Sequence, residues 1–151
     1  MNIKSLQKKP GNQGFSLIEL LVVIVILGVL GMWVGPKLIS RIGDAEIQET
    51  KTQIQSLETA LKMYKVDNGN YPTTGQGLQA LVQKPDTTPQ PRKWRKDGYL
   101  DSKKVPTDAW KNNYIYISPG VHGPYDITSY GKDGAPGGED EDKDINSWEL
   151  K

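Results

Sequence analysis

A chain of 151 residues is long enough for one domain with a sizeable core, but it is too short for two full domains and a linker. Its 19 Lys and Arg residues nearly balance its 18 Asp and Glu residues, so the net charge of +1 provides no basic field for gripping nucleic acid. The lack of cysteine excludes disulfide bonds, thiolate metal sites and a cysteine nucleophile.

An apolar segment occupies residues 15–35, and Glu19 is its only charged residue. A helix of this length extends about 31 Å, close to the ~30 Å hydrocarbon core of a bilayer, so the segment is predicted to span a membrane. Three lysines and no acid precede it, which predicts a cytoplasmic N-terminus and an external C-terminus. A removable secretory signal is the alternative, but the apolar run exceeds the usual length of roughly 7–15 residues and no A-x-A-like site follows it.

A carboxylate inside an apolar helix is costly unless it is paired, so Glu19 needs a partner. The residues around it, KKPGNQGFSLIEL, resemble the class III signal of type IV pilins and pseudopilins. The resemblance implies that a prepilin peptidase cuts between Gly14 and Phe15 and methylates the new N-terminus. It also implies that Glu19 pairs with the Phe15 amine of a neighbouring subunit. A carboxylate that snorkels to the bilayer edge is the simpler alternative.

The helix is predicted to continue beyond the apolar segment to about Asp67, for a total length of roughly 80 Å, and to end there because Asn68 and Gly69 supply a stop signal. Pro36 removes one backbone hydrogen bond, so a kink is expected there. Glu58 and Lys62 are predicted to form an exposed pair on the polar side. An amphipathic stripe that must pack on something is predicted from the spacing of Leu38, Ile42, Ile47, Ile54, Leu57, Leu61 and Tyr64.

The remaining residues predict a small α+β head. A short helical stretch is expected near residues 76–83, followed by a proline-rich surface loop. Three strand-like runs follow at residues 114–118, 125–129 and 145–148. So small a sheet is marginal alone and is expected to cover the apolar stripe of the long helix.

The segments NGNYPTTGQGLQALVQKP, VPTDAW and SYGKDGAPGGEDEDKDINSW resemble the major pseudopilins of type II secretion systems, within the type IV pilin-like superfamily. Type IV pilus subunits share the N-terminal part but usually close the C-terminal region with a disulfide, which this chain cannot form. Two positions depart from the family pattern. Family members commonly have proline at position 109 and glycine at position 111, where this chain has Ala109 and Lys111.

Six acidic residues lie between positions 133 and 144, interleaved with glycines. Carboxylates and turn carbonyls are the oxygen ligands that calcium takes. The stretch is not an EF-hand, because Ile145 stands where the loop glycine is required. Composition alone favours a solvated acidic tail.

The resemblance to major pseudopilins instead implies one structural calcium ion. Carried over by position, its ligands would be the carboxylates of three aspartates together with oxygens from Thr128, Tyr130 and Ala135. The aspartates are Asp133, Asp144 and either Asp142 or Asp140, with Asp142 preferred. The ion would clamp the last strand onto the head, and Trp148 would be a packed anchor.

Nothing in the sequence predicts an enzyme. The single histidine, His122, lies in the turn PGVHGPY without a nucleophile motif and is interpreted as an exposed turn residue. There is also no P-loop, and the glycines near Gln76 do not complete a dinucleotide fingerprint.

The sequence therefore predicts a leader at 1–14 that is removed, a transmembrane and assembly helix at 15–35, and a periplasmic head at 36–151. The predicted function is a structural subunit that polymerises into the periplasmic pseudopilus of a type II secretion system, which exports folded proteins. The implied partners are other copies, minor pseudopilins, the prepilin peptidase, and the inner-membrane assembly platform with its ATPase. Two alternatives remain: a monomeric membrane-anchored module with a calcium-dependent binding head, and a type IV pilus subunit.

Overall fold

The computed structural model describes residues 14–150, and for residues 33–40 it describes the backbone. The predicted leader lies outside the described residues except for Gly14. The chain divides into two units at Ser40, and each is described by itself.

A single helix, α1 (Leu17–Asn68), carries both halves of the predicted long helix. It begins two residues after Phe15, and it ends one residue beyond the predicted end at Asp67. Gly69, with φ of 88°, follows the last turn and donates its N–H to the Lys65 carbonyl at 2.7 Å. This left-handed glycine ends the helix as the sequence predicts.

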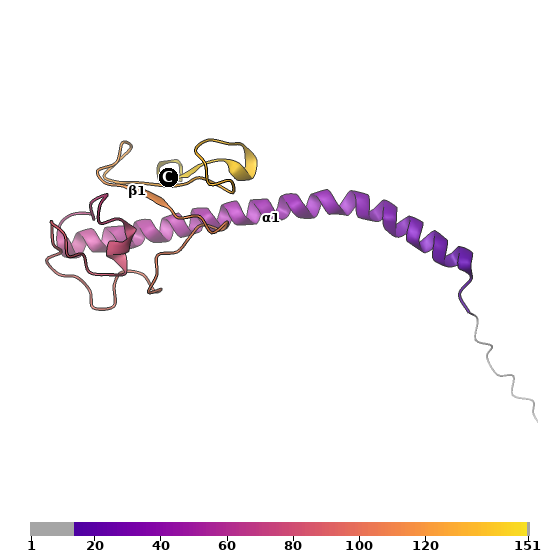
Figure 1. Cartoon of the computed structure of the whole chain (residues 1–151), viewed down its shortest axis with the longest axis horizontal. Coiled ribbons are helices and arrows are strands. Elements are labelled where there is room, and N and C mark those ends of the chain that lie inside the picture. Colours follow the sequence, from indigo (N-terminus) through magenta and orange to yellow (C-terminus); the bar gives the residue numbers. More distant parts are fainter. Residues whose placement is uncertain (1–13, 151) are drawn as a thin grey trace, which may run out of the picture. The chain divides into compact units, whose positions relative to one another are not determined.

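The second unit, which begins at Arg41, places a three-stranded antiparallel sheet beside α1 (Figure 1). The strands are β1 (Ile115–Ile117), β2 (Asp126–Ser129) and β3 (Ile145–Asn146), in the order β1-β2-β3. Tyr116 pairs with Ile127, and Ser129 with Ile145. Each predicted strand is present but shorter than expected.

Three short 3-10 helices complete the head: η1 (Leu78–Leu81), η2 (Asp140–Asp142) and η3 (Ser147–Glu149). The first confirms the short helix expected near residues 76–83. The third replaces the end of the predicted strand at 145–148, which turns into a helix after two residues. The proline-rich passage after η1 contains no helix or strand within its described residues.

The core forms where the stripe of α1 meets η1 and the sheet. From α1, Ile54, Leu57, Leu61 and Tyr64 are completely buried, which confirms the C-terminal part of the predicted stripe. Ile42 is 60% exposed, so its assignment to the stripe was wrong. The rest of the core is aromatic or aliphatic and comprises Ala60, Leu78, Ala80, Leu81, Tyr99, Tyr114, Tyr116, Tyr125, Ile127 and Ile145. Burying each large side chain stabilises the head by roughly 1.5–3 kcal/mol.

Candidate functional site

The first candidate site is the N-terminal part of α1. Every described side chain from Phe15 to Met32 is exposed, including 14 large hydrophobic ones. Glu19 lies in the first turn of the helix, where its N–H donates to the Ser16 carbonyl at 3.0 Å. A carboxylate at this end also faces the positive end of the helix dipole. The segment therefore offers a continuous apolar surface with one negative charge near its start.

The described part of the chain contains no helix with the length and apolarity that a membrane crossing requires. Pro36 lies inside α1 and does not end it.

The second candidate site is the acidic loop, residues 130–144. Its two halves lie against one another, because the Lys132 N–H donates to the Glu141 carbonyl at 2.9 Å. Gly131 and Gly138 make this approach possible. Both have positive φ, and a Cβ on either would overlap the backbone of Asp142.

The predicted calcium ligands occupy both halves of this loop and the neighbouring strand. The Thr128 hydroxyl, on β2, donates to the Asn146 side chain at 3.0 Å. Asp133 accepts the Ala135 N–H at 3.0 Å, and Asp144 accepts the Gly137 N–H at 3.0 Å. The Asp133 carboxylate therefore caps a local turn, whereas the Asp144 carboxylate connects two parts of the loop.

The remaining candidates lie close by. Asp140 and Asp142 are the ends of η2, and Tyr130 is half-buried just after β2. Within residues 14–150, however, no three acidic, histidine or cysteine side chains converge closely enough to hold a metal ion. The loop brings the donor-bearing segments together without assembling their carboxylates around one point.

A buried polar cluster fixes the start of the acidic loop, and sequence reasoning missed it. Asp108 is 1% exposed and accepts a hydrogen bond from the Ser129 hydroxyl at 2.6 Å. Its other oxygen accepts the Trp110 and Asn112 N–H groups at 3.1 and 2.7 Å. The Asn112 side chain then donates to the Gly131 carbonyl at 2.8 Å. An Asp at the first position of a tight turn is a signal for such an arrangement, because its side chain can accept the N–H two residues further on.

The two departures from the family pattern lie in this same turn. Ala109, unlike a proline, has an N–H, which donates to the Thr50 hydroxyl on α1 at 3.2 Å. Lys111 has φ of 74°, in the left-handed region that glycine adopts without strain. The backbone at position 111 thus keeps the conformation that a glycine would favour.

His122 belongs to a cluster that the sequence did not reveal, although its side chain is exposed as expected at 45%. Its ring stacks on Trp148 with 3.8 Å between centroids, and its Nδ1 lies 3.2 Å from the Asp126 carboxylate. Trp148 is half-buried and is not among the residues packed on the hydrophobic core, so its role as a packed anchor stays a prediction. Burial disfavours the charged form of Asp126, but hydrogen bonds from the Val121 and His122 amides and the His122 ring hold its pKa below its usual range.

Glu58 corrects a prediction. It is 9% exposed instead of forming a solvated pair with Lys62, and it accepts a hydrogen bond from the Tyr125 hydroxyl at 3.3 Å. The sheet covers this side of α1, which the helical pattern alone assigned to solvent.

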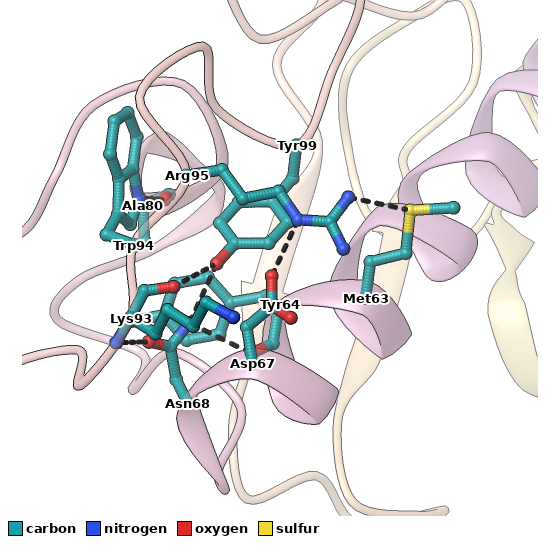
Figure 2. A network of polar contacts seen from close by, with 9 residues as sticks. All are labelled: Met63, Tyr64, Asp67, Asn68, Ala80, Lys93, Trp94, Arg95 and Tyr99. Atoms are coloured by element: carbon teal, nitrogen blue, oxygen red, sulfur yellow. Dashed lines mark hydrogen bonds and ion pairs between the residues drawn. The ribbon is translucent and has the colours of Figure 1, made fainter.

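The end of α1 is tied to the following loop by a polar network (Figure 2). Asn68 is buried and donates to the Tyr99 hydroxyl at 2.9 Å, and its oxygen accepts the Lys93 N–H at 2.9 Å. Arg95 pairs with Asp67 at 2.6 Å. This network holds the irregular segment of the head, where the described residues form no sheet hydrogen bonds.

Comparison with known proteins gives two family matches that cover most of the chain. Residues 37–148 match the family described as type II secretion system protein G, and residues 9–35 match the prokaryotic N-terminal methylation motif.

Individual relatives agree with these matches. The chain is 52% identical to the type II secretion system core protein G of Pseudomonas aeruginosa, over 90% of this chain and 94% of that protein. It is 47% identical to the Vibrio cholerae protein of the same description, over 97% of this chain and 98% of that protein. The crystal structure of the major pseudopilin of enterohaemorrhagic Escherichia coli superposes with a TM-score of 0.65 at 42% identity, covering 76% of this chain and 96% of that one.

Proposed function

The chain belongs to the type II secretion system protein G family and is a subunit of the pseudopilus, and we propose that copies polymerise through the segment 15–35. The observation that carries this proposal is the run of 14 exposed large hydrophobic side chains between Phe15 and Met32. Such a surface is unstable in water, because each side chain gains roughly 1.5–3 kcal/mol when it is fully buried. Packing against the same segment of other copies would bury it.

Glu19 would set the register of this packing. A carboxylate surrounded by apolar groups is costly unless it is paired, and an amine at the start of a neighbouring helix is a suitable counter-charge. Cleavage between Gly14 and Phe15 would create that amine. The match to the N-terminal methylation motif over residues 9–35 supports processing at this place.

Before assembly, the same apolar surface would lie in the inner membrane, with the N-terminus cytoplasmic and the head periplasmic. Processing would require the prepilin peptidase, and assembly would require the inner-membrane platform with its ATPase and the minor pseudopilins. The family membership supports this placement, since such a system moves proteins outward through the periplasm.

Replacing Glu19 tests the role of the charge. The variant Glu19→Ala should remain in the membrane fraction but lose filament assembly, as judged by electron microscopy of cells that express the secretion system. Glu49→Ala is the matched control, because Glu49 is an exposed acid on the same helix within the head. Filaments of normal length from Glu19→Ala would contradict the proposed pairing. Mass spectrometry of the wild-type protein should show a chain that begins with methylated Phe15.

We also propose that the acidic loop binds one calcium ion through oxygens of Thr128, Tyr130, Asp133, Ala135, Asp142 and Asp144. The donor chemistry fits calcium, and the loop already holds both ligand-bearing halves together. Binding would require Asp133 and Asp144 to exchange their bonds with backbone amides for the ion. When bound, calcium would neutralise part of the negative charge of the loop and stabilise the fold of the head.

Calorimetric titration of the full-length protein in detergent tests this site. One calcium ion should bind per chain, and Asp144→Asn should weaken the binding at least tenfold. Asp97→Asn, at an exposed acid in the distant segment after η1, should leave it unchanged. Equal binding by both variants would contradict the proposed ligand set.

A further inference from the structure

Lys132 and Glu141 are joined by two hydrogen bonds. The Lys132 N–H donates to the Glu141 carbonyl at 2.9 Å, and the Lys132 ammonium forms a salt bridge with the Glu141 carboxylate at 2.6 Å. One residue lies in the first half of the acidic loop and the other in the second. The pair therefore connects the two halves through both backbone and side chains.

The surroundings favour a cation at this place. Between positions 132 and 144 there are six acidic residues and only two lysines, Lys132 and Lys143. Among the described residues, Lys143 forms no salt bridge, so the two lysines differ in their contacts although they share one loop.

The Glu141 side chain also reaches α1. Its carboxylate lies against Gly43, where a Cβ would overlap it. Because glycine leaves this space free, the salt bridge sits directly on the surface of the helix. In Figure 1, the C-terminal part of the chain accordingly returns along α1.

We infer that Lys132 is a built-in counter-cation that keeps the acidic loop closed when no metal ion is bound. An acidic, glycine-rich loop repels itself and opens unless positive charge is supplied. Lys132 supplies one charge permanently, at the point where the two halves meet. The inference deepens the proposed calcium site, since the metal would then add to a loop that is already closed.

Thermal unfolding of the full-length protein in detergent and a calcium chelator tests the inference. Lys132→Gln and Lys143→Gln remove the same charge from the same loop, so their difference isolates the contact with Glu141. Lys132→Gln should melt about 2–4 °C below Lys143→Gln, the size expected for loss of one partly exposed ion pair from a domain of about 100 residues.

A charge swap provides the second readout. The double variant Lys132→Glu/Glu141→Lys should recover most of the loss seen in Lys132→Gln, because it restores opposite charges at the two positions. Equal melting of the two glutamine variants in chelator, or no recovery by the swap, would overturn the inference. If added calcium raised the melting temperature of no variant, the proposed metal site would fail, but the comparison in chelator would still decide the role of Lys132.

Discussion

The Glu58 carboxylate on α1 accepts a hydrogen bond from the Tyr125 hydroxyl just before β2, across a distance of 3.3 Å. Both residues are at least nine-tenths buried. Burial, together with the nearby Glu58 carboxylate, raises the pKa of Tyr125, so the phenol stays protonated and acts as a donor. The contact joins the long helix to the sheet by a polar bond within an otherwise apolar interface.

Removing this donor should destabilise the head. Tyr125→Phe leaves the buried Glu58 carboxylate without its described partner, which should lower the free energy of unfolding by roughly 1–3 kcal/mol. Chemical denaturation followed by circular dichroism measures this loss. Glu58→Gln combined with Tyr125→Phe should recover part of it, because a neutral amide is less costly to bury than a charge. If Tyr125→Phe alone had the same free energy of unfolding as the wild type, the contact would contribute nothing to stability.

Two tyrosines of the network at the end of α1 should respond in opposite ways to loss of the hydroxyl. Among the described residues, the buried Tyr64 hydroxyl has no hydrogen-bond partner, whereas the Tyr99 hydroxyl accepts from Asn68 and donates to Lys93 (Figure 2). Tyr64→Phe should therefore be neutral or stabilising by up to about 1 kcal/mol, and Tyr99→Phe should cost about 1 kcal/mol. Urea denaturation of both variants measures the difference. A larger loss from Tyr64→Phe would contradict this assignment of partners.

The apolar periodicity of the long helix and the glycine at its end predicted this part of the fold well. The apolar spacing of Ile54, Leu57 and Leu61 reports directly which face of a helix is buried, and Gly69 marks its end because glycine alone adopts the left-handed turn freely. The pattern could not show that the sheet also covers Glu58, because that depends on where residues more than 60 positions away pack.

The candidate sites, like the fold, could be predicted from the sequence only in part. Glu19 was recognisable because a charge within an apolar run is costly and stands out in one sequence. The salt bridge between Lys132 and Glu141 could not be recognised in the sequence, because any of the six acids in the loop could have been the partner of Lys132. The contacts of His122 with Trp148 and Asp126 likewise depend on tertiary packing, so an interpretation as a turn residue missed them.

Ionisation of Asp126 should make the stability of the head depend on pH. Its pKa in the folded protein is held below the unfolded value, so the ionised carboxylate stabilises the fold above the unfolded pKa. That contribution should be lost as the pH falls through the folded pKa, within a window below about pH 4. Unfolding experiments between pH 6 and 2 should show a shallower decline for Asp126→Asn than for the wild type. Parallel declines would mean that other carboxylates set the acid sensitivity.

Lys111 offers a site where stability should rise. Its φ of 74° costs a residue with a Cβ about 1 kcal/mol or more, and glycine removes this strain. Glycine also makes the unfolded chain more flexible, which offsets part of the gain. Lys111→Gly should therefore stabilise the head by roughly 0.5 kcal/mol, which thermal unfolding would register as a rise of about 2–4 °C.

A matched substitution separates this backbone effect from the loss of a lysine. Lys111→Ala removes the same side chain but keeps the Cβ, so it should not raise the melting temperature. The N–H of residue 111 still donates to the Asp108 carbonyl in both variants, because the bond uses the backbone. A rise of equal size in Lys111→Ala and Lys111→Gly would show that charge removal, and not release of the left-handed strain, explains the gain.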